Sequence, residues 1–201
     1  MPVSYVVTFT RSWPGRGVPV PAGGEERWAA RPSAWALPIT VAGDLVLIRH
    51  PGVLASIGAL CAYPDGFLFH LTIGLDPARV ASQAVSFHVR TPEERASASR
   101  LEVRFSNGKV ADSVAGMTHR AAYGQPVLRF SGGSSGICGN SPVARCEGRW
   151  WVSPLPPPGP VEFAVLLQGA AGPDGTAVID ASQITSAAAQ SETLWPKTDG
   201  E

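Results

Sequence analysis

The sequence predicts a mostly β fold: an antiparallel β-sandwich of immunoglobulin-like architecture with one short C-terminal α-helix. Three observations lead to this prediction. A turn motif stands at residues 63–66, several short runs alternate apolar and polar residues, and a single helix motif lies near the C-terminal end. Short strands separated by turn residues are typical of sandwiches and barrels. The 201 residues show no internal repeat and no break in composition, so we expect a single domain over 1–201.

The turn motif is Tyr63-Pro64-Asp65-Gly66. Proline fixes φ at the first central position of a turn, aspartate suits the second, and glycine tolerates a positive φ. The run that follows alternates strictly, which predicts a strand with one face in the core. The expected core face consists of Phe67, Phe69, Leu71, Ile73 and Leu75, and the more polar face consists of Leu68, His70, Thr72 and Gly74.

Further strands are expected on both sides of this hairpin. The dipeptide Asn107-Gly108 predicts a tight reversal after one of them. The proline-rich run 154–158 is expected to end another, because proline cannot donate a hydrogen bond to a neighbouring strand. The expected strands cover 3–10, 39–41, 44–48, 53–63, 85–89, 101–105, 126–130, 149–152, 161–167 and 176–179.

Two segments are expected to lack regular structure. Residues 1–36 are interrupted by Gly and Pro but contain Trp13, Trp28 and Trp35. Tryptophan is highly buried on average, so we expect this irregular segment to pack on the body of the domain. Residues 131–147 begin Ser-Gly-Gly-Ser-Ser-Gly, a composition that predicts a flexible loop.

Residues 180–195 contain the helix motif. Asp180 and Gln183 have the spacing of a capping box, in which side chains satisfy the free N–H groups at a helix N-terminus. Pro196 is expected to end the helix. Residues at helical spacing form one stripe, made of Ile184, Ala187, Ala188, Ser191 and Trp195.

The charge balance and the cysteines restrict the partners and the compartment. Lys and Arg together number 16, as do Asp and Glu, and this net charge of zero argues against nucleic acid and membrane surfaces as partners. No apolar run approaches the ~20 residues that span a bilayer, and the N-terminus does not resemble a secretory signal. The odd set Cys61, Cys138 and Cys146 favours free thiols in a reducing cytoplasm. A disulfide between Cys138 and Cys146 stays open as an alternative.

The sequence contains none of the short motifs that would indicate a cofactor or a catalytic centre. The Gly-rich segment lacks the Gly-Lys-Ser/Thr of a phosphate-binding loop. Cys138 and Cys146 are too few for a zinc site, and no Gly-x-Ser-x-Gly motif is present. We therefore expect no cofactor and no metal, and the sequence favours a protein that is not an enzyme.

Three residues are the candidate binding residues: Trp150, Trp151 and His70. Neighbouring residues of a strand point to opposite faces, so one of the two tryptophans is expected to face outward as a protein contact or a platform for sugar stacking. The alternative is that the N-terminal segment or the C-terminal helix covers it. His70 lies on the more polar face of a predicted strand, where it is either a functional histidine or an ordinary surface one.

The chain also resembles a family of uncharacterised actinobacterial proteins over roughly residues 40–196. The resemblance rests on the Gly-rich segment 132–139, the run Trp150 to Pro160 that ends Pro-Leu-Pro-Pro-Pro-Gly-Pro, the strand 161–167, and the final Leu194-Trp195-Pro196. The hairpin at 62–67 and the segment 103–108 are also similar to that family. These motifs are structural, and the resemblance implies no activity and no catalytic residues.

The function that the sequence favours is a non-catalytic binding or assembly module that acts through protein–protein contacts. Such a module would use an outer sheet face or the segment that joins the tryptophans to the proline run. Two alternatives stay open. One is an enzyme with a dispersed site near His70, and the other is a β-sandwich that binds a small molecule or sugar between its sheets.

Overall fold

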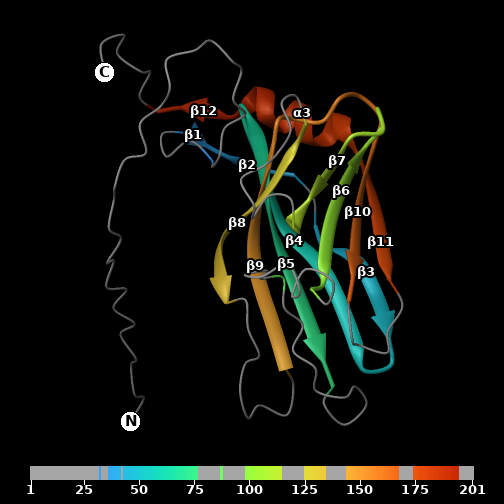
Figure 1. Ribbon diagram of the computed structural model, residues 1–201. Coiled ribbons are helices and arrows are strands. Elements are labelled where there is room, and N and C mark those ends of the chain that lie inside the picture. Colours follow the sequence, from blue (N-terminus) through green and yellow to red (C-terminus); the bar gives the residue numbers. More distant parts are fainter. Residues whose placement is uncertain are drawn as a thin grey trace, which may run out of the picture.

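The computed structural model describes residues 32, 36–41, 43–76, 87, 98–114, 125–134, 144–167 and 174–194. Most of these residues lie in strands, and the fold is mostly β with antiparallel sheets and one short helix (Figure 1). The elements are β1 (Ala36–Leu37), β2 (Ile39–Thr40), β3 (Leu45–His50), β4 (Val53–Tyr63), β5 (Gly66–Leu75), β6 (Arg100–Phe105), β7 (Val110–Asp112), β8 (Val127–Ser134), β9 (Ala144–Ser153), β10 (Pro160–Leu166), β11 (Gly175–Asp180), α3 (Ala181–Gln190) and β12 (Glu192–Thr193).

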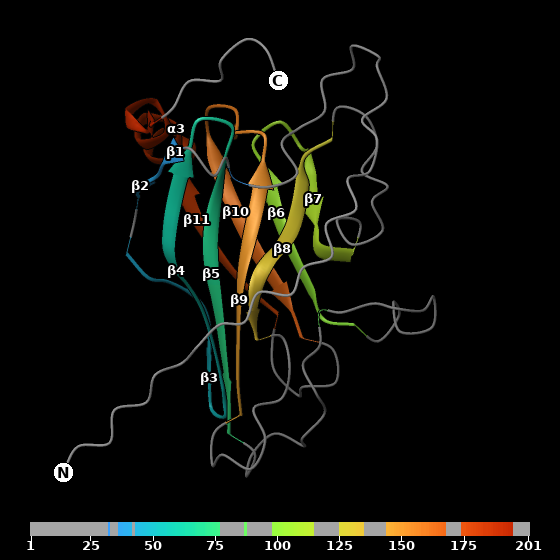
Figure 2. The ribbon, with the colours of Figure 1, turned by 90° about the vertical axis from the view of Figure 1, so that its left-hand side faces the viewer.

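The strands form a large sheet, a small sheet and one short pair. The large sheet has the order β2-β4-β5-β9-β8, with β3 also paired to β4. The small sheet has the order β11-β10-β6-β7, and β1 pairs with β12. In Figure 2 the large sheet faces the viewer and the small sheet lies behind it. The outer faces of these two sheets are therefore the broad surfaces that the described strands offer to a partner.

Apolar side chains from both sheets fill the space between them as one core. At its centre, Phe163 of β10 packs edge-on against Phe69 and Phe67 of β5, with ring centroids 5.1 and 6.2 Å apart. All three phenylalanines are fully buried. Edge-to-face packing of this kind adds to the stabilisation that burial of the rings provides. The core thus joins the two sheets through aromatic contacts.

The predicted hairpin at residues 63–66 is confirmed. Tyr63 and Gly66 pair as the last and first residues of β4 and β5, which leaves Pro64 and Asp65 as the two-residue turn. The five residues of the predicted core face are all buried, with exposed fractions of 9% or less. Gly66, however, does not have the positive φ for which we assigned it. A Cβ on this residue would collide with the carbonyl oxygen of Val152 and with the Trp151 ring, so glycine is needed here for a close approach.

The helix is confirmed but shorter than the predicted 180–195. Asp180 is the N-cap, and its carboxylate accepts a hydrogen bond from the N–H of Ser182 at 2.7 Å. Gln183 has no part in this cap, so the predicted capping box is wrong. The helix ends at Gln190, with Ser191 as C-cap, because Glu192 and Thr193 then pair with β1. Its buried residues pack against β2, β4, β5 and β11 across one end of the sheets, at the top of Figure 1.

The predicted loop over 131–147 is wrong at both of its ends. β8 continues to Ser134 and β9 begins at Ala144, and Ser134 pairs with Glu147. A bulge lies between Phe130 and Gly132, and Gly132 and Gly133 have φ values of +138° and +124°. Glycine adopts such values without strain, so the strand can continue past the bulge. Residues 135–143 lie outside the described residues.

The strand before the proline run ends at Ser153, as predicted. The reversal at Asn107-Gly108 is confirmed, with Gly108 at φ +79° and a hydrogen bond from its N–H to the Phe105 carbonyl. The segment 1–31, the predicted strand 3–10 and most of 85–89 lie outside the described residues.

Candidate functional site

Both tryptophans of the Trp150-Trp151 pair are buried, with exposed fractions of 2% and 0%. The expectation that one of them faces solvent as a contact or stacking platform is therefore wrong, and the alternative, in which the outward-pointing tryptophan is covered, agrees with this burial. Trp150 points into the core, where its ring meets Phe87 and Phe130 edge-on at 5.7 and 5.4 Å. Trp151 points to the outer face of the large sheet, as strand alternation requires, but it is covered there.

The outer face of the large sheet divides into a buried part and an exposed part. In the buried part, near α3, the Tyr63 ring packs edge-on against Trp151 at 5.5 Å, and burial raises the pKa of the Tyr63 phenol. Leu68, Val127 and Ser153 are also buried there. The exposed part lies toward the β3–β4 turn. We call it the basic zone, and define it as Val46, Arg49, Leu54, Ser56, Gly58, His70, Thr72, Gly74, Arg145, Glu147 and Arg149.

The strand register arranges the basic zone in rows that run across β3, β4, β5 and β9. One row is Arg49, Leu54, Gly74 and Arg145, because each of these residues pairs with the next. Leu54 is 46% exposed although it is a large apolar side chain. Apart from its chain neighbours, no described residue has an atom within 4 Å of the position that a Cβ on Gly74 would occupy, so the face has open space at this point. The row thus combines an exposed leucine, an open glycine and an arginine at each end.

His70 lies in another row of the basic zone, between Gly58 of β4 and Arg149 of β9. It is exposed, and it makes no hydrogen bond or ion pair with any residue that the structure describes. The Asp44 carboxylate approaches the same row, with Oδ1 2.7 Å from where a Cβ on Gly58 would be. The register thus places His70 between Gly58, over which the Asp44 carboxylate lies, and Arg149, whose guanidinium lies over Gly132 on the far side from His70.

The arginines of the basic zone differ in how much of their charge is paired. Arg145 forms an ion pair with Glu147, and both side chains are about half exposed or more. Arg49 and Arg149 are exposed and make no hydrogen bond or ion pair within the described part of the chain. An exposed ion pair contributes at most ~1 kcal/mol to stability, so Arg145 can also bind the carboxylate of a partner. Sequence reasoning missed Arg145 because it assigned residues 131–147 to a loop.

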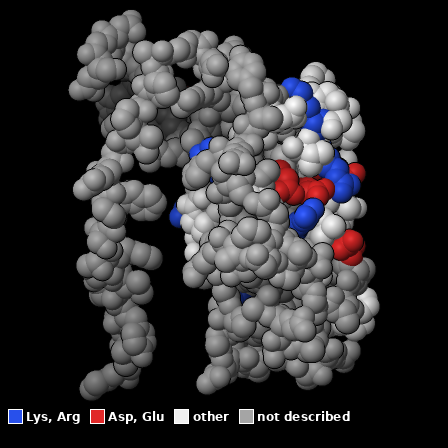
Figure 3. Space-filling view, in the orientation of Figure 1, with Lys and Arg blue, Asp and Glu red and all other residues white. Residues whose placement is uncertain are grey.

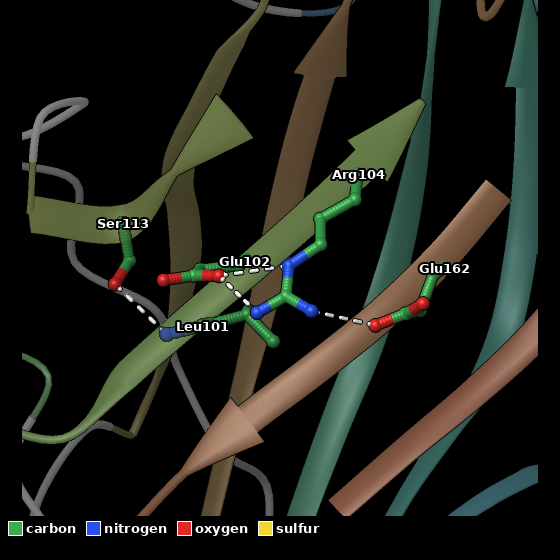
Figure 4. Close-up of polar contacts among 5 residues, drawn as sticks. All are labelled: Leu101, Glu102, Arg104, Ser113 and Glu162. Carbon is green, nitrogen blue, oxygen red and sulfur yellow. Dashed lines mark hydrogen bonds and ion pairs between the residues drawn. The ribbon is translucent and has the colours of Figure 1, made fainter. Parts of the chain in front are cut away.

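The outer face of the small sheet shows the opposite arrangement. Arg104 of β6 donates to Glu102 at 2.8 Å and to Glu162 of β10 at 2.8 Å (Figure 4). The hydrogen bond to Glu102, above all, raises the pKa of the Arg104 guanidinium further. Figure 3 shows these opposite charges gathered over β6 and β10. Because they neutralise one another, this face has less to offer a charged partner than the basic zone.

Within the described ranges, no group of three or more His, Cys, Asp or Glu side chains could hold a metal ion. Cys61 is a free thiol, and Cys138 lies outside the described residues. No helix in the described part of the chain is long and apolar enough to cross a membrane.

Asp65, in the β4–β5 turn, is expected to make stability depend on pH. Its Oδ1 is buried and finds no hydrogen-bond partner among the described residues. Burial raises the pKa of the Asp65 carboxyl, so the folded state favours its protonated form. The stability that protonation confers is complete below the pKa of the unfolded chain and is lost as the pH rises through the folded pKa. Asp65→Asn, which cannot ionise, should therefore raise Tm at pH 7.

Thermal unfolding between pH 3 and pH 7 checks this expectation. The gain from Asp65→Asn should shrink toward zero at pH 3, where Asp65 is protonated in both states. Asp174→Asn is the control, because Asp174 is an exposed carboxylate just before β11, and it should leave Tm nearly unchanged. A rise in Tm of Asp65→Asn that persists at pH 3, or a fall in its Tm at pH 7, would contradict the role assigned to the buried oxygen.

Comparison with known proteins adds no relative to these observations. No family model, no curated protein and no solved structure matches the chain.

Proposed function

We propose that the protein is a non-catalytic binding module and that the basic zone is its contact surface for a protein partner. One observation carries the proposal: Leu54, an exposed apolar side chain, pairs across the strands with Arg49, which is exposed and makes no hydrogen bond or ion pair within the described residues. Arginine is enriched at protein interfaces, interface cores are more apolar than the rest of the surface, and removing an exposed apolar side chain from water favours binding. The rigid strands beneath reduce the ordering entropy lost on binding.

We propose an immunoglobulin-like β-sandwich as the architecture of this module. In such a fold, strands in the order A-B-E-D pack against a sheet built from C, F and G. The order β4-β5-β9-β8 in one sheet and β11-β10-β6-β7 in the other supports this, if β7 is an added strand beside C. The Phe69–Phe163 contact would then join strands B and F, where antibody domains have their disulfide. The actinobacterial family resemblance and a cytoplasmic location, which suits the free thiol of Cys61, belong to the same proposal.

The other functions considered have less support. An enzyme near His70 would need a partner that positions its ring, and within the described residues His70 has no hydrogen bond. A sugar platform at Trp151 would need an exposed ring, and this ring is 0% exposed. The protein-binding role needs neither feature.

Site-specific photo-crosslinking tests the proposed function. Leu54→p-benzoylphenylalanine places the reactive group in the basic zone, and irradiation of the native host cells should give a discrete protein adduct. Val178→p-benzoylphenylalanine is the matched control, because Val178 is 57% exposed but lies on the outer face of the small sheet. No adduct from position 54, or the same adduct from both positions, would contradict the proposal.

A further inference from the structure

From the row Arg49, Leu54, Gly74 and Arg145 we infer that the basic zone binds an acidic, extended protein segment with the pattern acid–x–apolar–x–acid. This inference rests on the proposed function and specifies the chemistry of the partner. It follows from three properties of the row: its charge, the open space over Gly74, and the spacing of its two arginines.

The charges of the zone favour an acidic partner. The zone contains three positively charged side chains, those of Arg49, Arg145 and Arg149. The negatively charged side chains are Glu147 within the zone and Asp44 nearby. The two arginines that end the row are both exposed, and each guanidinium can donate several hydrogen bonds to a carboxylate. A basic segment would meet like charge at both ends of the row.

The middle of the row favours an apolar side chain between the two acids. Leu54 is 46% exposed, and its neighbour on β5 is Gly74, which has no side chain. A side chain laid over Gly74 would therefore enter open space and contact Leu54 from the side. Removing the Leu54 side chain from water contributes favourably to the free energy of binding, in addition to the contribution of the charges.

The spacing of the row sets the spacing of the segment. Arg49 and Arg145 lie on strands separated by three inter-strand steps, about 14 Å in all. In an extended chain, residues i and i+4 are about 13 Å apart, and i, i+2 and i+4 point to the same side. Two acids at i and i+4 can thus meet the two arginines, while the residue at i+2 lies between Leu54 and Gly74.

A synthetic peptide tests this pattern on the full-length protein. The probe is the peptide Gly-Glu-Ser-Leu-Ser-Glu-Gly with blocked ends. Its binding is measured from the amide chemical shifts of the protein in NMR spectra recorded during a titration. We expect shifts at Leu54 and Gly74 that saturate with peptide concentration. Two control peptides, one with Lys in place of both Glu and one with Ser in place of Leu, should bind at least about threefold more weakly.

Variants of the row provide the second part of the test. Arg49→Ala should weaken binding of the acidic peptide by about threefold. Gly74→Val should abolish the saturable shifts, because it fills the open space, and unchanged circular dichroism would show that the fold is intact. Val178→Ser, on the other sheet, should leave binding unchanged.

The possible failures are distinguishable. If the acidic peptide causes no shifts in the zone, or if the lysine peptide binds equally well, the inference is overturned. Should cross-linking from position 54 nevertheless succeed, the proposed function stands and only the acidic pattern is wrong. Absence of cross-linking from position 54 overturns the proposed function itself.

Discussion

Gly66→Ala is expected to destabilise the protein by about 3 kcal/mol, near the upper end of the usual range for overpacking. The added Cβ would overlap the carbonyl oxygen of Val152 and lie 2.6 Å from a carbon of the Trp151 ring. Neither obstacle can move freely, because one is main chain and the other is a fully buried side chain. The β5–β9 pairing would therefore have to shift at this point. Urea denaturation with a matched wild-type curve measures the change.

Gly74→Ala is the matched control on the same strand. Its Cβ would enter open space, and alanine in a strand interior is favoured over glycine by about 0.5–1 kcal/mol. The two alanines should therefore change stability in opposite directions. Equal effects at the two positions would show that strand propensity, and not close packing at Gly66, decides the outcome.

Phe163→Ala should destabilise the protein by about 3–5 kcal/mol. Phe163 is fully buried and is the ring of the small sheet that meets both Phe67 and Phe69 of the large sheet. Its removal leaves a cavity between the sheets and also takes away both edge-to-face contacts. Since domains of this kind are stable by only about 5–15 kcal/mol, the variant should lie close to the limit of folding.

Val178→Ala provides the comparison for Phe163→Ala in the same urea experiment. Val178 belongs to the neighbouring strand β11 but is 57% exposed, so its truncation should change stability by less than about 0.5 kcal/mol. A loss below about 1.5 kcal/mol for Phe163→Ala would mean that the two sheets repack readily without this ring.

The parts of the fold that could be predicted from sequence depend on local patterns. Phe67, Phe69 and Ile73 are all 0% exposed, as the alternation along β5 requires. The turn at Pro64-Asp65 was predictable because its chemistry lies within four consecutive residues. The start of α3 at the Asp180 cap was predictable for the same reason.

The errors arise where distant residues decide the outcome. Trp151 is buried because the outer face of the large sheet is covered at that point, and alternation along a strand does not report such cover. Gly66 is required by its approach to Val152 and Trp151, more than eighty residues away in the chain. The helix ends before Pro196 because Glu192 and Thr193 pair with β1. None of these contacts leaves a local pattern in the sequence.

The candidate site was predictable only in part. His70 was correctly placed on the more polar face of its strand, where it is exposed. Its neighbours Gly58 and Arg149 could not be predicted, because they lie beside it only through the register of β4, β5 and β9. The glycines and serines before residue 137 favoured a loop, and this composition concealed the alternation of Arg145, Glu147 and Arg149 along β9.

The pairing of β1 with β12 has a mechanical consequence. Ala36 lies opposite Thr193, and Leu37 lies opposite Glu192, so the chain enters and leaves this ladder at the same end. A pulling force applied through the two flanking segments would separate these strands one residue pair at a time, as a zipper opens. Such peeling needs far less force than shearing long strands past one another. The two-residue ladder would therefore release first under load, before tension reaches β4, β5 and the aromatic core.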